Sequence, residues 1–487
     1  IWCKQFPCFH SAYLYHLMVA TRAFLSIYGL VLAPCVRFCF AGGMMRRDNS
    51  AESANLRAEL EKLVSEDAAH RLFAIEAIVR PTFEAFPKNS AGKIPMQAMH
   101  SIARSYFAEE HGWMIKGFEF VDAIGAKPKQ LHSSQILHKR APQLAQALSE
   151  GHRLEIGLSL SDLVLVVAAL EHLILDESTN VLSAAFTLHG ISSEGELDAR
   201  QVAEVLESFM VLFRRGVRSD LANATQHKLD MAIAEVHSDW GKLVTYVANS
   251  IESHRQDGSF SYGDVSQIMR DMLLRYGKWQ NSECVEMRDK LVSLQLPGTG
   301  RVPFALFHEQ PENEHYSFRE SVEYLRQLNA LDEAEEGNPK VLIANYLASP
   351  SNCIASSEFF SVCCLNECER LFNDLEIRLQ SSDVSLKQLF AAVRETSSNT
   401  VAAPRELSAN ITTMAERLSL DGSTTIPIHS GEFRRWFHHV FPNECPFPTS
   451  LDVAAEEAMR AAADRWLGRN RAPAWQVNAV GESIQSS

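Results

Sequence analysis

Apolar side chains recur at the spacing of one helix face along most of the chain, and this feature limits the possible folds most strongly. Leu56, Leu60 and Leu63 follow the three- and four-residue intervals of an amphipathic helix. The same pattern predicts helices at 141–148, 161–175, 200–213, 230–251, 262–274 and 283–294. Strand patterns are confined to very short pieces. We therefore expect a nearly all-α fold.

Length and charge exclude several classes of protein. At 487 residues the chain is too long for one ordinary core and suits two or three domains. Its 46% hydrophobic and 22% charged residues exclude a disordered chain. The formal net charge is −14, and an acidic chain does not neutralise phosphates. Nucleic acid and anionic lipid are therefore not expected as partners.

An uncharged stretch at 23–36, AFLSIYGLVLAPCV, follows the basic Arg22. Its length fits the apolar part of a signal peptide and is too short to span a bilayer. Two interpretations stay open: residues 1–43 are a secretory leader, or they are untranslated sequence ahead of a start at Met44 or Met45. The first predicts the secretory pathway or an extracellular location, and the second predicts the cytoplasm. We expect no membrane span in the mature chain.

The remaining chain divides by composition. An acidic run at 332–336 is typical of solvated surface. The end of the chain is polar. We predict a helical domain at 50–340, a helical Cys-rich domain at 345–470 and a flexible tail at 471–487.

Four short loops share a glycine that is followed, two residues later, by an apolar residue. The pairs are Gly92 with Ile94, Gly195 with Leu197, Gly258 with Phe260, and Gly300 with Val302. Helical patterns surround these loops, and Phe83 and Phe86 precede the first of them. This framework resembles the EF-hand, in which the glycine occupies loop position six and the apolar residue forms a short pairing strand at position eight. The resemblance implies EF-hand-like helix pairs within 50–340.

The resemblance also implies which residues would bind calcium. Candidate ligands in the loops at 190–201 and 253–264 are Ser192, Glu194, the carbonyl of Glu196, Asp198, Asp257 and Asp264. Gln201 replaces the glutamate that normally closes the first loop, and Arg255 stands at a ligand position of the second. The loops at 87–98 and 295–306 lack ligands, because Ala98 and Leu306 occupy position twelve. We expect calcium to be the sole cofactor and its binding to be weak.

EF-hands occur in pairs joined at position eight, and spacing suggests which loops pair. A pair requires roughly 35–45 residues between its two position-eight residues. Leu158 and Leu197 are 39 residues apart, and Phe260 and Val302 are 42 apart. These two pairs are therefore predicted, while the loop near Gly92 has no evident partner.

Cysteines are concentrated in the last third of the chain. The six that follow the leader are Cys284, Cys353, Cys363, Cys364, Cys368 and Cys445. If 352–372 is a helix, Cys363 and Cys364 face about 100° apart and reach two different partners. Structural disulfides, including one from Cys284 into the cluster, are one interpretation. The others are a zinc site using Cys364, Cys368 and His438 or His439, and plain buried thiols.

The segment 345–448, with NYLASPSNCIASS, SVCCLNEC and HHVFPNECPFP, is similar to uncharacterised proteins of photosynthetic protists, which implies no activity. Phosphate-binding loops and the common hydrolase and metalloprotease motifs are absent from the sequence. We expect a non-enzymatic EF-hand-like protein that binds a protein partner, with or without calcium. The alternative is an enzyme that uses the Cys and His residues of 345–470, as a thiol hydrolase or with zinc.

Overall fold

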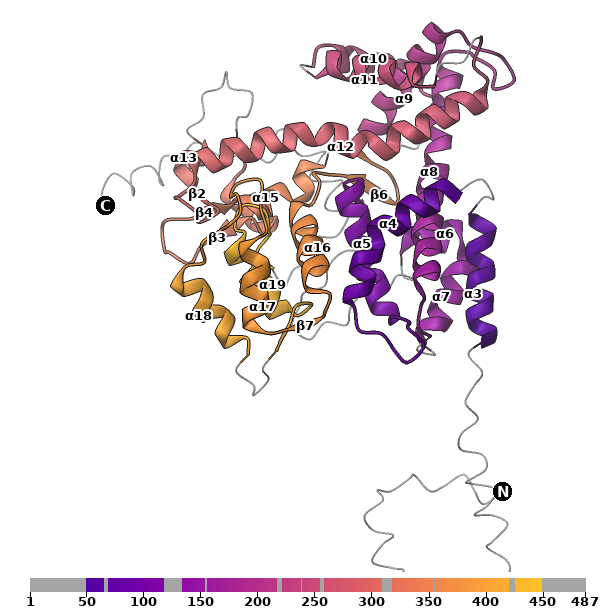
Figure 1. Ribbon diagram of the computed structural model, residues 1–487. Coiled ribbons are helices and arrows are strands. Elements are labelled where there is room, and N and C mark those ends of the chain that lie inside the picture. The colour runs from indigo at the N-terminus through magenta and orange to yellow at the C-terminus, as the bar shows by residue number, and fades with distance from the viewer. Residues whose placement is uncertain are drawn as a thin grey trace, which may run out of the picture. The chain divides into compact units, whose positions relative to one another are not determined.

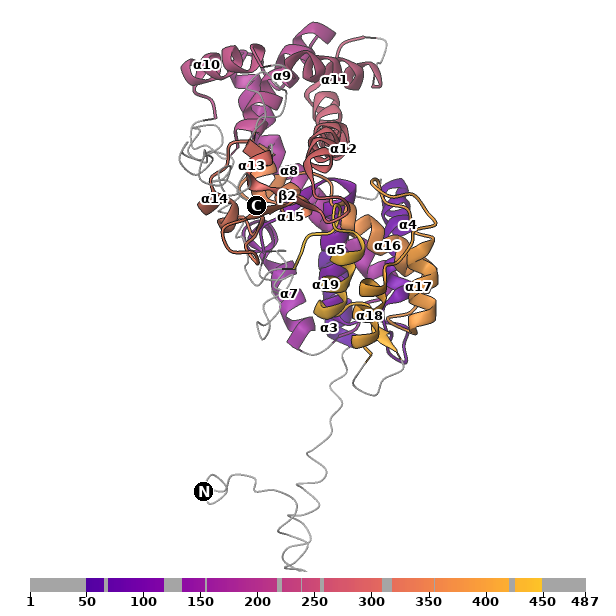
Figure 2. The ribbon, with the colours of Figure 1, turned by 90° about the vertical axis from the view of Figure 1, so that its left-hand side faces the viewer.

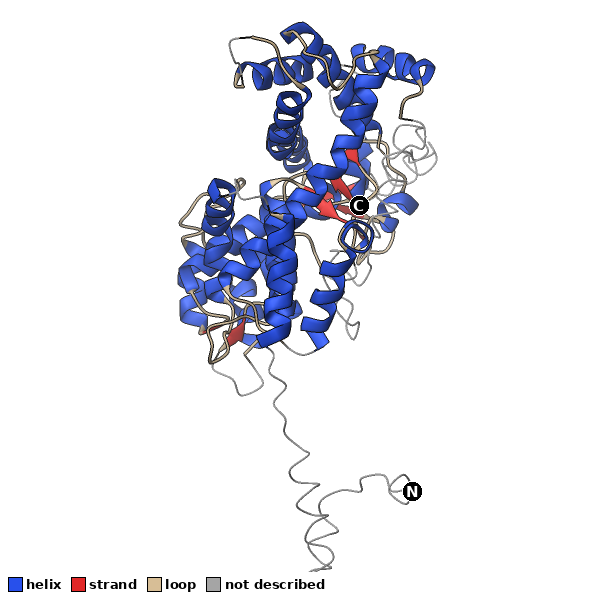
Figure 3. Ribbon diagram, turned by 90° about the vertical axis from the view of Figure 1, so that its right-hand side faces the viewer, coloured by secondary structure: helices blue, strands red, loops and turns tan. Residues whose placement is uncertain are grey.

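Helices make up most of the structure (Figures 1 and 3), as the apolar spacing predicted. The computed structural model describes residues 50–64, 69–117, 134–153, 156–216, 221–237, 239–254, 258–308, 318–353, 355–419 and 425–448. By its contacts the chain divides into Ile1–Ala51 and Glu52–Ser487, and nearly all described residues belong to the second unit. The predicted leader at 1–43 and the predicted tail at 471–487 lie outside the described residues.

The longest helices lie within residues 50–294. They are α3 (Ser50–Leu63), α4 (Ala69–Ala85), α5 (Met96–Glu110), α6 (Gln135–Arg140), α7 (Pro142–Arg153), α8 (Leu160–Leu188), α9 (Ala199–Arg215), α10 (Ala224–Glu235), α11 (Trp240–Glu252) and α12 (Tyr262–Leu294). The later helices are α13 (Phe304–His308), α14 (Val322–Gln327), α15 (Ile343–Leu347), α16 (Glu367–Leu379), α17 (Leu386–Arg394), α18 (Ala409–Arg417) and α19 (Gly431–Val440), with a 3₁₀ turn at Pro350–Asn352. None of the described helices is long and apolar enough to cross a membrane.

The strands are two or three residues long and antiparallel. They are β1 (Trp113–Ile115), β2 (Arg301–Pro303), β3 (Leu331–Asp332), β4 (Lys340–Leu342), β5 (Ala355–Ser356), β6 (Phe360–Val362), β7 (Asp383–Val384) and β8 (Ile426–Pro427). They form sheets in the orders β1-β6-β5, β2-β4-β3 and β7-β8. The first sheet pairs Trp113 with Val362, so it connects segments on either side of the boundary predicted near 340. The division into 50–340 and 345–470 stays a prediction.

Short bridges join the helix–loop–helix units two by two. Ile94 pairs with Leu158 and Leu197 with Phe260, each through two backbone hydrogen bonds of 2.8 to 2.9 Å. Strand pairing does the same for β2 with β4 and for β7 with β8. Successive units therefore combine α4–α5 with α7–α8, α8–α9 with α11–α12, α12–α13 with α14–α15, and α16–α17 with α18–α19.

The predicted pairing of Leu158 with Leu197 and of Phe260 with Val302 is wrong. Each predicted pair is separated by one uninterrupted helix, α8 or α12. At 1.5 Å per residue, 29 and 33 helical residues hold the two loops roughly 40 to 50 Å apart. Each loop instead meets the neighbouring loop on its own side of the long helix, and Ile94 gains the partner that the sequence did not suggest.

A local rule repeats where a bridge leads into a helix. In four units the bridge residue is followed at once by an N-cap that forms a capping box with the third helical residue. The bridge, cap and third residues are Leu158, Ser159 and Asp162; Leu197, Asp198 and Gln201; Phe260, Ser261 and Asp264; Val384, Ser385 and Gln388. Because the caps satisfy the first backbone N–H groups, each helix begins at a fixed residue beside its bridge.

Buried apolar side chains form three clusters. The largest spans α3 to the first half of α12 and includes Phe360 of β6. A second lies around the end of α12 and the short helices up to α15. The third lies among α16–α19, with Trp436 and Phe433 at its centre. Helix α12 runs across the Glu52–Ser487 unit and contributes to the first two clusters (Figure 1).

Four predicted helical segments differ from the structure. The segment 230–251 is broken into α10 and α11, where Asp239 accepts from Arg214 and lies 2.5 Å from Nδ1 of His237. The segments 262–274 and 283–294 are one helix. The Cys-rich segment is extended before α16, because β6 pairs with β1 and the N–H of Cys363 donates to the Gly112 carbonyl at 2.8 Å.

A buried carboxylate joins four helices of the first cluster. Glu171 of α8 accepts from both Nε and Nη2 of Arg71, the first at 2.7 Å, and from the Tyr106 hydroxyl at 3.0 Å. Nε2 of His111, just after α5, lies 2.9 Å from the same carboxylate, and its Nδ1 lies 2.9 Å from the carbonyl oxygen of Leu274 in α12. Burial alone would raise the pKa of Glu171, but hydrogen bonds and charges from Arg71 and His111 outweigh it and lower the pKa to about 2. The Glu171 cluster thereby fixes α4, α5, α8 and α12 to one another.

Glu171→Gln should lower the free energy of unfolding by about 2 kcal/mol or more, because it removes the counter-charge of the half-buried Arg71. Glu61→Gln is the matched control: its side chain is 55% exposed, and we expect a change below about 0.5 kcal/mol. Urea titration measures both. A carboxyl whose pKa is lower in the folded state stabilises the fold above its unfolded pKa, near 4.5, and loses that effect as pH falls towards 2. The difference in free energy of unfolding between wild type and Glu171→Gln should therefore decrease as pH falls from about 4.5 towards 2. A difference that does not change with pH would contradict the role of the Glu171 carboxylate.

Candidate functional site

The predicted calcium ligands lie in two loops that the Leu197–Phe260 bridge brings together. Ser192, Glu194, Glu196 and Asp198 precede α9, and Asp264 lies in the first turn of α12. Asp257 lies outside the described residues. Glu196 accepts a hydrogen bond from Ser259 of the opposite loop, so the two loops are also joined through side chains.

The carboxylates of these loops act as helix caps. Asp198 accepts from the backbone N–H of Gln201 at 2.8 Å, and the Gln201 side chain accepts from the N–H of Asp198 at 3.0 Å. Asp264 accepts from the backbone N–H and the hydroxyl of Ser261, at 2.8 and 2.6 Å, and these bonds lower the pKa of Asp264. The side chains at the closing position of both loops therefore fold back over the helix start. Across the part of the chain that the structure describes, no three His, Cys, Asp or Glu side chains are grouped to hold a metal ion.

A second candidate is a cavity of about 340 Å³ where α5, β1, α12, α15, α16 and the segment after α19 meet. Apolar side chains line much of it, among them Phe107, Val285 and Leu347. Arg104, Arg288 and Arg434 line it together with Glu367 and Glu369. We call this space the central cavity.

Two glycines allow the backbone to approach closely enough to form the cavity wall. Gly112 has φ +64°, and a Cβ on it would lie 2.4 Å from the carbonyl oxygen of Cys363. A Cβ on Gly277 of α12 would lie 1.9 Å from the carbonyl oxygen of His111. No larger residue fits at either position, because each contact is far below van der Waals distance. The turn at His111–Gly112 is thus pressed between α12 and the strand β6.

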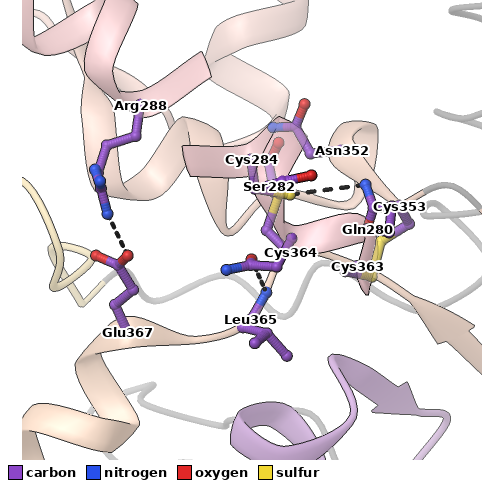
Figure 4. Close-up of a disulfide and its surroundings, with 12 residues drawn as sticks. Gln280, Ser282, Cys284, Arg288, Asn352, Cys353, Cys363, Cys364, Leu365 and Glu367 are labelled. Atoms are coloured by element: carbon purple, nitrogen blue, oxygen red, sulfur yellow. Dashed lines mark hydrogen bonds and ion pairs between the residues drawn. A yellow bond between two sulfur atoms is a disulfide. The ribbon is translucent and has the colours of Figure 1, made fainter. Parts of the chain in front are cut away.

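Three disulfides surround the cavity. Cys284 of α12 is bonded to Cys364, Cys353 to Cys363, and Cys368 of α16 to Cys445. Figure 4 shows the first two side by side, with Gln280 donating to the Cys284 sulfur at 3.8 Å. The predicted disulfide framework is confirmed, as is the divergence of Cys363 and Cys364. The physical reason differs from the predicted one, since neighbours on an extended chain point to opposite sides.

Ion pairs neutralise the charges in the cavity wall. Arg288 donates to Glu367 (Figure 4) and also to Asp289 at 2.8 Å. Arg104 donates to Glu369 at 2.6 Å, and Arg434 lies 3.9 Å from the same carboxylate. Burial alone would raise the pKa of Glu369, but the charges of Arg104 and Arg434 outweigh it and lower the pKa.

Some buried polar atoms of the wall have no hydrogen-bond partner within the described structure. These are Oε2 of Glu367, Oδ1 of Asn443 and Nδ2 of Asn329. Asn345 shows how such a side chain can bind a peptide backbone: it donates to the Phe447 carbonyl at 3.0 Å and accepts from the Phe447 N–H at 2.7 Å. Asn345 thereby holds the segment after α19 against the wall of the cavity.

The Cys and His side chains of the alternative enzyme are engaged in other contacts. Cys364 and Cys368, the predicted zinc ligands, are in different disulfides, and all six described cysteines are bonded. His438 is fully buried, and its Nδ1 lies 2.6 Å from the Cys445 carbonyl oxygen. Burial lowers the pKa of His438 to about 4, which leaves the ring neutral near pH 7. No described cysteine supplies the thiolate that a thiol hydrolase or a zinc site requires.

Sequence reasoning found the cysteines but not the cavity. The arginines and glutamates named above in the cavity wall come from helices α5, α12, α16 and α19 and share no sequence motif. The one local signal was the crowding of cysteines, which marked the segment after β6 as a place where distant elements meet. Comparison with protein-family models, with curated proteins and with solved structures gave no match.

Digestion without reductant, followed by mass spectrometry, should return linked peptides for Cys284–Cys364, Cys353–Cys363 and Cys368–Cys445, one of fifteen possible pairings. Replacing Cys284 and Cys364 by serine opens a loop of 80 residues, against 10 for Cys353 and Cys363. The chain-entropy model gives the longer loop a larger loss of stability, by roughly 1 to 2 kcal/mol. Denaturant midpoints and slopes of the two double variants measure this. Peptides linked in another pattern would show that the wall of the central cavity is not assembled as described.

Proposed function

We propose that this chain is a calcium-independent, EF-hand-like interaction protein, and that its central cavity receives an apolar segment of a protein partner. The observation that carries the proposal is the use of Asp198 and Asp264 as helix caps. A carboxylate that accepts from the start of its own helix is not free to close a calcium cage without losing that cap.

The EF-hand-like nature of the units is supported by their geometry. Each bridge lies between two loops, and in the four units with a capping box it immediately precedes the N-cap. Gly92, Gly195, Gly258 and Gly300 each lie two residues before a bridge residue. The same pattern extends to α16–α19, where no glycine lies two residues before a bridge residue and no sequence motif indicated the pairing.

A fixed scaffold fits the contacts better than a sensor does. In sensor EF-hands the two helices of a unit change their angle when calcium binds. Here the Glu171 cluster joins four helices, and the disulfide from Cys284 fastens α12 to the start of α16. Moving α4 away from α8 would break the Arg71–Glu171 ion pair, and moving α12 away from Cys364 would strain a covalent bond.

The chemistry of the cavity favours a neutral, apolar segment of polypeptide. Arg104, Arg288 and Arg434 already face carboxylates, so a charged ligand would have to displace one of these pairs. Apolar walls offer burial to one or two side chains of a partner.

An oxidising compartment is part of the proposal. The described residues contain three disulfides. Disulfides form and persist in secreted proteins and are rare in cytosolic ones. They favour the secretory interpretation of residues 1–43 over the cytoplasmic one.

Calcium should leave the fold unchanged. Thermal unfolding of the full chain in 0.1 mM calcium and in excess chelator should give midpoints within about 1 °C, because a site with a dissociation constant of about 10⁻⁴ M or weaker adds little stability at that concentration. Asp198→Ala and Asp264→Ala should each cost about 1 kcal/mol as lost caps, equally with and without calcium. Tight calorimetric binding that either substitution abolishes would overturn the calcium-independent assignment.

The cavity should take up a neutral apolar probe. Nile red fluorescence should titrate to one site on the full chain, and Val285→Trp, which fills the cavity, should weaken binding at least about fivefold. Ala91→Trp adds the same ring to an exposed loop and serves as the control. Unfolding midpoints verify that both variants fold. Equal binding by wild type and Val285→Trp would exclude the central cavity as the binding site.

A further inference from the structure

Helix α10 carries its apolar residues on the outside. Leu229 is 55% exposed and Val236 is 85% exposed. Ala232 is exposed as well, and Ile233 is half-buried. These four residues are spaced three, one and three apart, which places them on one face. An amphipathic helix normally turns such a face to the core. We call these four residues the α10 stripe.

The opposite face of α10 is polar and buried. Asp230, whose side chain is 0% exposed, pairs with Arg215 at the end of α9. Gln226 donates to the same carboxylate at 2.7 Å, and Nε2 of His227 lies 3.0 Å from the Ser208 hydroxyl. Turning the stripe inward would remove Asp230 from its counter-charge, so these contacts hold the helix in this orientation.

Helix α10 also lies at an outer end of the Glu52–Ser487 unit. Figures 1 and 2 show it with α9 and α11 at the end away from α16–α19. A rigid helix that presents apolar side chains at such a place has the form of an interaction surface.

We propose that the α10 stripe is the contact surface of an antiparallel homodimer of this chain. Lys228 and Glu235 are both exposed and seven residues apart, so they lie two turns from each other on the same flank of the stripe. Along the sequence, the midpoint between Lys228 and Glu235 lies one residue from the midpoint between Leu229 and Val236. A two-fold axis at that point brings Lys228 against Glu235 of the partner subunit, and the reverse pair follows by symmetry.

The surroundings of these two charges favour the same partner. Glu235 lies near Glu207, and burial together with the charges of Glu204 and Glu235 raises the pKa of Glu207, so this end of α10 is acidic. Within the described contacts neither Lys228 nor Glu235 forms an ion pair. In the dimer, Lys228 of one copy meets the acidic end of α10 in the other, and Glu235 of the first meets Lys228 of the second. A partner that carries only one sign of charge would satisfy only one of these two positions.

The contact is small, and the dimer should be weak. A helix of 12 residues is about 18 Å long, and two such faces bury less than a standard interface. We expect a dissociation constant between about 10⁻⁶ and 10⁻⁴ M. Sedimentation velocity of the full chain between about 1 and 200 µM should show the average mass rising from monomer towards dimer.

Leu229→Glu combined with Val236→Glu should weaken the dimer at least about tenfold, because it places like charges across the two-fold axis. Phe73→Glu is the matched control, since Phe73 is 74% exposed and lies on α4. It should leave association unchanged. All of these side chains are exposed, and unfolding midpoints verify that the variants fold.

A charge exchange tests the symmetry itself. Lys228→Glu alone should weaken the dimer, and Lys228→Glu with Glu235→Lys should restore it, because both cross-axis pairs are then re-formed in reverse. A chain that stays monomeric at 200 µM overturns the proposal. So does a dimer that the Leu229 and Val236 substitutions leave intact, or one that the double exchange fails to restore.

Discussion

The buried carboxylate of Glu171 is the interaction on which the rest of the fold depends. It lies on the long helix α8 and binds Arg71 of α4, Tyr106 of α5 and His111 of the turn that follows. His111 in turn faces the Leu274 carbonyl of α12. Because a buried carboxylate without these partners would be costly, one side chain sets the positions of four helices.

A series of direct contacts connects the Glu171 cluster to the central cavity. The turn at His111 presses on Gly277, and Gly112 receives the strand that leads to Cys363 and Cys364. The disulfide from Cys364 returns to α12 at Cys284, one and a half to two turns beyond Gly277. The central cavity is therefore enclosed by elements that are fixed by charge, by close backbone contact and by covalent bonds. Such a wall is typical of a pre-organised binding site, which does not change its conformation when the partner binds.

The two surfaces proposed for binding differ in kind. The cavity is concave, and its wall contains apolar side chains and paired charges. The α10 stripe is convex and flanked by two unpaired charges of opposite sign. Since they lie on different helices, a dimer through α10 and a partner in the cavity are compatible, and each can be removed by substitution without touching the other.

The sequence by itself determined the helical class, the short loops with their glycines and bridge residues, and the divergence of Cys363 and Cys364. These depend on local spacing and on caps such as Ser261 with Asp264, which act within a few residues. The tertiary structure decided which loops pair, because an unbroken α8 or α12 separates the partners that spacing suggested. It also decided that charges from α5, α12, α16 and α19 share one cavity and that α10 faces outward. Each of these follows from contacts with distant residues, such as Asp230 with Arg215, and no local pattern encodes them.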